Sequence, residues 1–395
     1  MTTRRHDIDA LRALAFALLI GYHLCMLYVA EWDWHIKSAD TFYWLQPLMI
    51  GLNRWRMDLI FLVSGLAASF LLKPGAAARF AWQRTLRLFV PLVFGMLVIV
   101  PAQPYVQGVS NGLVDPGFGA FLARYYTGAS WPPGAFSGWE HGYTWNHLWY
   151  LAYLWIYTLV LALLARPLAS RVGQKLRVAF TGLRGWQLLV LPAIPLFAYT
   201  VTLQPLFEDT GDFFHDWYRN AVYFTVFVYG FLIARDAGIW AEFVRLRRAA
   251  LAIAAWVFLA YIVLVLWVPD DAAAPIQALV WGLRNLYIWT MLCAILGWSC
   301  HALNHPFRWL PWANDNVYPW YILHQSLIVL VAYWLIPLEL HAGVEALLVL
   351  AGTVLGCWAI TALVRRIDWL RPLFGLKRRT ISPAKNAAPV LVGGA

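Results

Sequence analysis

Charged side chains are scarce in this sequence. Only 13% of the 395 residues are Asp, Glu, Lys or Arg, whereas soluble domains average about 25%. Hydrophobic residues make up 62% of the chain, which is more than the core of a soluble domain can bury. The composition therefore excludes an ordinary soluble globular protein, and we expect many apolar side chains to face lipid.

Cysteine is also rare, with four in the chain: Cys25, Cys293, Cys300 and Cys357. All four lie in or at the end of apolar runs, and none forms a C-x-x-C pair or a zinc-type spacing. We expect them to be small core residues. The sequence predicts no metal site and no permanently bound cofactor.

The chain shows no clear signal-peptide cleavage site, no internal repeat and no second domain. The first apolar run, preceded by Asp7 and Asp9, is therefore expected to be an uncleaved membrane span. We predict one transmembrane domain over residues 1–372 and a basic, disordered cytoplasmic tail over residues 373–395. The basic start of the tail, "KRR", would lie against anionic lipid.

Long apolar runs are what the sequence does contain, and a membrane helix needs about 20 mostly apolar residues. We predict an all-α, polytopic membrane protein with about ten spans. The run at 187–204 is interrupted by proline, which membrane helices tolerate. The ten predicted spans are 10–30, 48–72, 88–104, 147–165, 187–204, 219–234, 249–268, 276–299, 317–337 and 343–364.

The distribution of basic residues predicts the orientation of these spans. With the N-terminus inside, the inner segments hold 24 Lys and Arg, the outer segments hold five, and Arg284 lies within a span. This is the positive-inside pattern, with both termini in the cytoplasm. The net charge of +10 therefore reflects contact with the lipid bilayer and does not indicate a nucleic-acid partner.

Arg12 and His23 are the most informative pair, because both are ionisable and lie on the first span. They are eleven positions apart, so they share one helix face and lie about 16 Å apart along the axis. Arg12 would then sit at headgroup level and His23 near the middle of the membrane. A histidine that simply hydrogen-bonds to a neighbouring helix is the alternative to a functional residue.

Arg84 and Arg87 form an R-x-x-R pair at the start of the third span. Such a pair serves either as ordinary positive-inside anchoring or as a phosphate site, because guanidinium groups bind phosphate well. Together with Arg12 they would form a cytoplasmic basic cluster. A carrier such as coenzyme A could bind there through its phosphates and extend its thioester inward to His23, where a neutral imidazole can act as a base.

The order of these motifs resembles that of the acyltransferase-3 family of integral membrane acyltransferases. The family pattern includes an arginine, ten residues and a histidine, followed by R-x-x-R. "FLVSGLAASFLL" (61–72), "HLWYLAYL" (147–154) and "VYPWYILHQSLIV" (317–329) are similar to further blocks of the family. Within it, "WHIKSAD" (34–40) and "RMDLIFLVSG" (56–65) look like the glucans biosynthesis protein C branch, which is assigned to succinylation of periplasmic glucans.

The resemblance implies transfer of an acetyl or succinyl group from cytoplasmic acyl-CoA to a hydroxyl of a periplasmic carbohydrate, such as an osmoregulated glucan. It implies a multi-pass protein of the bacterial cytoplasmic membrane, with acyl-CoA as a co-substrate. Glycan-assembly proteins are possible partners. The enzyme class would be an acyltransferase that transfers groups other than aminoacyl groups.

The resemblance also assigns roles. His23 becomes the catalytic base, and Arg12, Arg84 and Arg87 bind the acyl donor. Asp9 occupies the acidic position three residues before the entrance arginine, and we count it and His324 with His23 as catalytic residues. Two positions depart from the pattern: Tyr318 replaces a small residue, and Pro319 follows it directly.

Other residues are candidates from their positions alone. His324 is predicted to lie about 15 Å deep in its span, at the level of His23, where it acts as an orienting residue, contacts the acceptor or makes a structural hydrogen bond. His147 and Trp149 could bind the acceptor or anchor the helix at the membrane interface. His35 and Arg56 are further acceptor-site candidates.

Two other classes of protein stay open at this point. A transporter or flippase for a glycan or lipid intermediate would also need many spans and buried charges, although such proteins often have two similar halves. A non-catalytic partner of glycan assembly would have no use for the spacing of Arg12 and His23. The route of the acyl group is equally open, through a pore that exposes His23 to both sides or through a covalent acyl-histidine.

Overall fold

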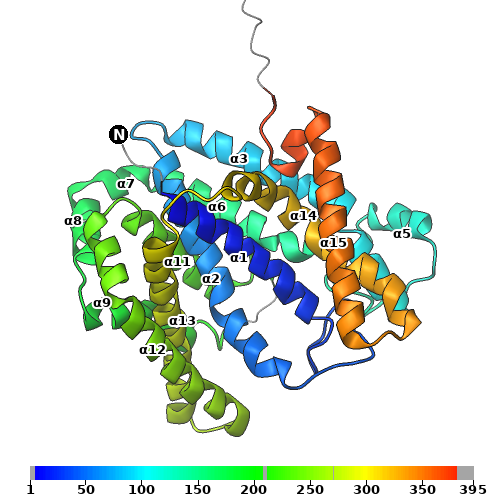
Figure 1. Cartoon of the computed structure of the whole chain (residues 1–395), viewed down its shortest axis with the longest axis horizontal. Helices are drawn as coiled ribbons and strands as arrows, with labels where there is room; N and C mark the ends of the chain where they lie inside the picture. The colour runs from blue at the N-terminus through cyan, green and yellow to red at the C-terminus, as the bar shows by residue number, and fades with distance from the viewer. Residues whose placement is uncertain (1–4, 208–210, 270, 380–395) are drawn as a thin grey trace, which may run out of the picture.

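The computed structural model describes residues 5–207, 211–269 and 271–379, and these residues are mainly helical (Figure 1). No strand occurs among them, apart from one isolated bridge between Val29 and Phe42. The α-helices are α1 (His6–Cys25), α2 (Leu45–Leu71), α3 (Ala77–Phe94), α4 (Ala102–Ser110), α5 (Phe118–Tyr125), α6 (Trp149–Leu163), α7 (Ala165–Ala169), α8 (Arg171–Thr181), α9 (Trp186–Val190), α10 (Ala193–Thr202), α11 (Trp217–Ile233), α12 (Ala237–Trp267), α13 (Ala274–Ala302), α14 (Leu310–Leu335) and α15 (Ala342–Arg366). The described residues also contain short helical turns of other types: a π-helix over Gly95–Ile99 and 3₁₀ turns over Trp139–His141, Asn146–Leu148, Ile336–Leu338 and Arg371–Phe374.

Seven helices in the described part of the chain are long and apolar enough to cross a membrane. The number becomes eight if the segments 171–181 and 186–202, bent by 107°, count as one broken span. The predicted all-α membrane fold is therefore confirmed. The count of ten spans and the N-in orientation stay predictions, although each of the ten predicted runs coincides with helical structure.

Small residues allow α2 and α11 to pack closely. A side chain at Gly65 would collide with the carbonyl of Phe227, and one at Gly230 would collide with the carbonyl of Leu62. The two glycines therefore face each other's helix backbone, as small residues often do between membrane helices. This contact fixes α2, which carries Arg54, Arg56 and Asp58.

The segment between α1 and α2 folds back into the protein. The Lys37 ammonium donates to the carbonyls of Met26 and Val29, at 2.8 and 2.5 Å, and the Phe42 amide donates to the carbonyl of Tyr28. These bonds hold the segment against the turn that follows α1, and His35 lies inside, with 7% of its surface exposed. A residue that the sequence places just outside the first span thus lies in the interior.

The C-terminal end of the described chain packs against α3. Phe374 is buried and packs against Phe94 with 5.2 Å between ring centroids. The predicted tail boundary at residue 373 therefore falls within a packed segment, and residues 380–395 lie outside the described part.

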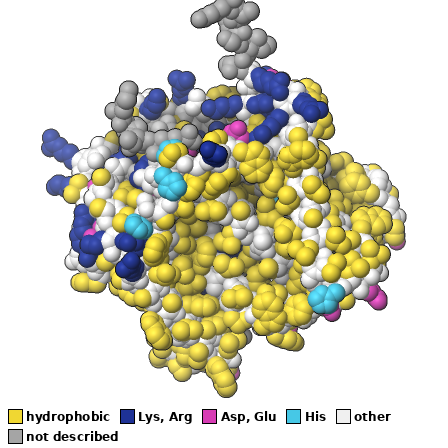
Figure 2. All heavy atoms as spheres, viewed as in Figure 1, with side chains coloured by type: hydrophobic (Ala, Val, Ile, Leu, Met, Phe, Trp, Pro, Cys, Tyr) yellow, Lys and Arg dark blue, Asp and Glu magenta, His cyan; other side chains and the backbone are white. Residues whose placement is uncertain are grey.

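Figure 2 shows a broad hydrophobic surface, with Lys and Arg side chains gathered mainly along the top and left, where α3, α7 and α8 lie in Figure 1.

Candidate active site

His23 on α1 and His324 on α14 lie side by side in the middle of the helix bundle. The two helices are neighbours, and Nδ1 of His23 lies 2.9 Å from Nε2 of His324. The rings are stacked at 26°, with 5.1 Å between their centroids. The structure thus brings together the two histidines that the sequence predicts at one depth.

The surrounding hydrogen bonds determine where the protons lie on the two rings. Nδ1 of His324 lies 2.8 Å from the carbonyl of Tyr321, which can only accept, so this nitrogen carries a proton. No carboxylate is paired with either ring among the described residues, and a buried charge without a partner is costly. In the neutral state, Nε2 of His324 therefore accepts, Nδ1 of His23 donates, and Nε2 of His23 keeps a free lone pair.

A buried hydrogen-bond network of amide and histidine side chains lies next to the pair of His23 and His324. Nε2 of His147 donates to the carbonyl of Ile322 at 3.0 Å, so its Nδ1 accepts from the Gln103 amide at 3.1 Å. The Gln325 amide bridges the Gln103 oxygen at 2.9 Å and Nε2 of His35 at 3.0 Å. Every donor in this hydrogen-bond network has an acceptor, which holds the side chains of the site in fixed positions.

His35 completes the network from the segment between α1 and α2. Its Nδ1 donates to the Gln107 oxygen at 2.8 Å, which also accepts from the Ser137 amide. Burial lowers the pKa of His35 to about 4, against the smaller opposing effect of the Gln107 hydrogen bond. His35 is therefore neutral at physiological pH.

A cavity of about 660 Å³ opens on one side of the histidine pair; we call it the histidine cavity. It takes in all four acceptor-site candidates, His35, Arg56, His147 and Trp149, together with His23. Other charged side chains that line it are Asp33, Arg54, Asp58, Arg219 and Arg284.

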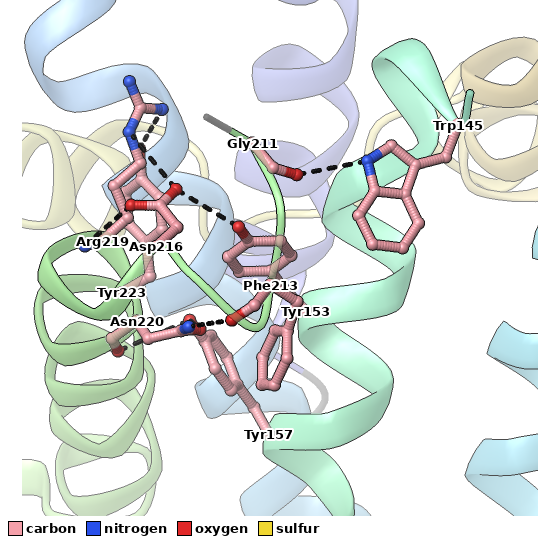
Figure 3. A network of polar contacts seen from close by, with 9 residues as sticks. All are labelled: Trp145, Tyr153, Tyr157, Gly211, Phe213, Asp216, Arg219, Asn220 and Tyr223. Atoms are coloured by element: carbon pink, nitrogen blue, oxygen red, sulfur yellow. Dashed lines mark hydrogen bonds and ion pairs between the residues drawn. The ribbon is translucent and has the colours of Figure 1, made fainter. Parts of the chain in front are cut away.

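One wall of the histidine cavity is held by a polar network at the start of α11 (Figure 3). Asp216 lies 3.8 Å from the Arg219 guanidinium and accepts from the Tyr153 hydroxyl at 3.2 Å, and Arg219 also donates to the Tyr223 hydroxyl. Burial raises the pKa of the Asp216 carboxyl to about 6. These bonds tie α11 to α6 and position Arg219 at the cavity.

A second cavity of about 460 Å³, the arginine cavity, is lined by the three predicted donor-site residues, Arg12, Arg84 and Arg87. Arg12 donates to the Asn314 oxygen at 2.7 Å and lies 3.8 Å from Asp9. Nε of Arg84 is buried and has no hydrogen-bond partner among the described residues. The cavity combines these cations with an apolar lining, which suits a phosphorylated ligand with an apolar arm.

Asp9 is not beside His23. It lines the arginine cavity with Arg12, fourteen positions before His23 on α1, which is about 21 Å along the helix axis. Asp9 and His23 are therefore not in direct contact. Its carboxylate instead faces the arginine group.

Three aromatic rings separate the two cavities. Phe16 lies 5.3 Å from Tyr321 and 6.3 Å from Tyr150, measured between ring centroids, and Tyr321 lies 5.8 Å from Tyr150. All three line the arginine cavity, whereas the opposite side of Tyr321 contacts the rings of His147 and His324. We call these three rings, which lie between the arginine cavity and the histidine pair, the aromatic partition.

The sequence did not identify several residues of the site. Gln103 and Gln325 carry the buried network, and Arg54, Arg219 and Arg284 line the histidine cavity. Amides inside the apolar runs "VPAQPYV" and "YILHQSL" were the available signal for the two glutamines. Contacts between distant segments decide which of these polar residues meet, so spacing along one helix could not reveal them.

Comparison with known proteins identifies the family of the chain. The acyltransferase-3 family profile, described as an acyltransferase domain, matches residues 5–362. The chain therefore belongs to this family of membrane acyltransferases, and it is a multi-pass membrane enzyme.

Among curated proteins, the chain is similar to glucans biosynthesis protein C of Escherichia coli, for example from strains K12, SMS-3-5 and O1:K1. Each is 23% identical over 155 residues, which is 39% of this chain and 37% of the relative. The similarity thus spans little more than a third of those proteins. No solved structure matches the chain.

Proposed function

We propose that the protein transfers an acyl group, acetyl or succinyl, from cytoplasmic acyl-CoA to a hydroxyl of a periplasmic carbohydrate. His23 carries this proposal: its ring lines the histidine cavity, and its hydrogen bond to His324 leaves the lone pair of Nε2 free. A positioned imidazole with a free lone pair is a general base for a hydroxyl nucleophile.

In the proposed reaction the acceptor hydroxyl lies against Nε2 of His23. Its oxygen attacks the thioester carbonyl while its proton passes to Nε2, and the carbon–sulfur bond then breaks to release the coenzyme A thiolate. The imidazolium that forms keeps its Nδ1 proton in the bond to His324, whose own Nδ1 proton is bonded to the carbonyl of Tyr321. The proton on Nε2 then passes to the departing thiolate, which restores the neutral base.

The donor enters from the arginine cavity in this proposal. Arg12, Arg84 and Arg87 hold the phosphates, and the arm of the carrier extends past the aromatic partition toward His23. The distance of about 16 Å between Arg12 and His23 along α1 suits an extended pantetheine arm. The rings of Phe16, Tyr150 and Tyr321 must separate when the donor binds.

The acceptor binds in the histidine cavity. Trp149, Trp32 and Trp34 line it, and aromatic faces pack well against the apolar faces of sugar rings. The name of the relatives, glucans biosynthesis protein C, supports an osmoregulated glucan as the acceptor. The enzyme would then act in the bacterial inner membrane beside other glycan-assembly proteins.

Purified protein in lipid nanodiscs tests the proposal. Wild type, His23→Ala and His301→Ala receive acetyl-CoA or succinyl-CoA with neutral gluco-oligosaccharides, and free thiol and oligosaccharide mass are followed. His301 is exposed and lines neither cavity, so it is the matched control. We expect thiol release and an added acyl mass in wild type and control, with a loss of at least 100-fold in His23→Ala.

Full transfer by His23→Ala would refute the role of the base. If wild type neither binds nor cleaves any acyl-CoA, the donor assignment is wrong. In that case transport of a glycan or lipid intermediate becomes the better reading of the two cavities.

A further inference from the structure

The histidine cavity carries more positive charge than a neutral sugar needs. Four arginines line it, Arg54, Arg56, Arg219 and Arg284, against the two carboxylates of Asp33 and Asp58. Arg219 already has the Asp216 carboxylate as a partner at 3.8 Å. The charge balance of the cavity therefore depends on what the other three arginines contact.

Among the described residues, Arg56 and Arg284 donate hydrogen bonds to neutral groups, and the Arg54 guanidinium lies 5.7 Å from the centroid of the Tyr261 ring. Arg284 donates to the Thr200 hydroxyl, the Gln204 oxygen and the Tyr218 hydroxyl, at 3.2, 2.6 and 2.8 Å. Arg56 donates to the Asn53 oxygen at 3.0 Å. No ion pair joins Arg54, Arg56 or Arg284 to a carboxylate within 4.0 Å in the part of the chain that the structure describes.

The burial of these groups makes that arrangement unusual. Only 7% of the Arg284 surface is exposed, and Nε of Arg54 is buried without a hydrogen-bond partner among the described residues. Arginines removed from water are normally paired, because an uncompensated buried cation is costly. A site that keeps such cations around an open cavity is built to receive the opposite charge from a ligand.

The position of Arg56 relates this charge to the reaction centre. Its guanidinium lies 3.7 Å from the centroid of the Tyr22 ring, and the Tyr22 ring lies 5.8 Å from that of His23. The cation is therefore one ring away from the proposed base. Arg54 and Arg284 line the same cavity and extend the positive surface away from it.

We infer that Arg54, Arg56 and Arg284 form an oxyanion-binding subsite, so that one of the two molecules that meet at His23 carries a carboxylate or a similar anion. This inference rests on the proposed function and deepens it. The anion has two possible sources: the far end of a dicarboxylic acyl group, or an acidic substituent on the carbohydrate acceptor. Both would use the guanidinium fork in the same way.

Matched substrate pairs distinguish the two sources. For the donor, succinyl-CoA is compared with butyryl-CoA, which has the same number of acyl carbons and no free carboxylate. For the acceptor, neutral gluco-oligosaccharides are compared with the same oligosaccharides carrying a uronic acid. Thiol release and product mass give kcat/KM for each pair with wild type, Arg56→Gln, Arg56→Lys and Arg284→Gln.

We expect wild type to prefer the charged member of one pair, and Arg56→Gln to reduce kcat/KM for that member about 30-fold, because a charge-assisted hydrogen bond is lost. The neutral member should change less than about 3-fold, and Arg56→Lys should restore part of the loss. Arg124→Gln is the matched control, since Arg124 lines neither cavity and its ring contact is with Trp131. Thermal unfolding of each variant excludes misfolding, which matters most for Arg284→Gln.

Equal losses for charged and neutral substrates, or no loss in either variant, would overturn the subsite. A separate binding measurement keeps its failure distinct from failure of the proposed function. Free succinate and free glucuronate are titrated against wild type and Arg56→Gln, with the melting temperature as readout. Stabilisation by either anion that Arg56→Gln abolishes would support the subsite even if wild type transferred no acyl group. An absence of stabilisation, together with an absence of charge preference, would refute it.

Discussion

His324 is predicted to control catalysis through the proton on His23, without touching the substrate itself. Its Nε2 accepts the Nδ1 proton of His23 at 2.9 Å, and this bond keeps the lone pair of His23 on Nε2, toward the cavity. His324→Leu removes the acceptor and keeps a similar side-chain volume. His23 can then rotate or move its proton to Nε2, and both changes reduce the fraction of enzyme with a usable base.

The size of the effect follows from the bond that is lost. Hydrogen-bond partners that orient metal-ligating histidines typically contribute about 10- to 100-fold to activity. We apply the middle of this range to His23 and expect kcat to fall about 30-fold, or about 2 kcal/mol. KM for acyl-CoA should change little, because His324 does not line the arginine cavity. His324→Gln is the matched variant: its amide oxygen can accept the same proton and should restore most of kcat.

Initial rates of thiol release at varied acyl-CoA, with melting temperature as a check on folding, measure these effects. An unchanged kcat in His324→Leu would refute the orienting role. A loss as complete as that of His23→Ala, with no recovery in His324→Gln, would mean that His324 itself transfers the proton.

Three further predictions concern the donor site, the packing and the response to acid. Arg84→Gln should raise KM for acyl-CoA about 10-fold with a smaller change in kcat, because it removes a phosphate contact. Arg79→Gln, on the exposed face of the same helix, is the control and should leave KM unchanged. Equal KM values for the two variants would exclude Arg84 from the donor site. Gly65→Ala should destabilise the protein by about 1–3 kcal/mol, since the new methyl group meets the backbone of α11, whereas Gly21→Ala has free space; equal melting temperatures would contradict this packing. His35 has a folded-state pKa of about 4, below its usual value near 6.5, so the neutral ring contributes stability above about pH 6.5 that is lost as the pH falls toward 4, by up to about 3 kcal/mol. Thermal unfolding between pH 4 and 8 should therefore show a flatter acid limb for His35→Gln, and parallel curves would contradict the prediction.

The spacing of residues along single helices predicted the part of the site that lies on those helices. Arg12 and His23 share α1 at a known rise and rotation per residue, and the depth of His324 followed from its distance to the start of its span. The rise per residue, applied to both helices, places His23 and His324 at the same depth in the membrane, where neighbouring helices can bring the two side chains together.

The rest of the site depends on contacts that no local pattern contains. His35 lies inside because the segment between α1 and α2 folds back through Lys37. Gln103 joins the network because α4 continues the line of α3 after a π-helical turn. Asp9, a catalytic candidate three positions before Arg12, lies about 21 Å from His23 along the axis of the same helix and lines the arginine cavity, so its part in catalysis stays a prediction.

The aromatic partition of Phe16, Tyr150 and Tyr321 has a consequence for the membrane as an electrical insulator. Two cavities that met in a continuous column of water would conduct protons, and a membrane that holds an ion gradient cannot tolerate such a leak. Because the three rings pack against one another beside the histidine pair, they place apolar surface across such a column, and we expect the bilayer to keep its voltage while the enzyme is idle. In the proposed mechanism the arm of the donor separates the three aromatic side chains and fills the gap between them, so that protons do not leak across the membrane during turnover.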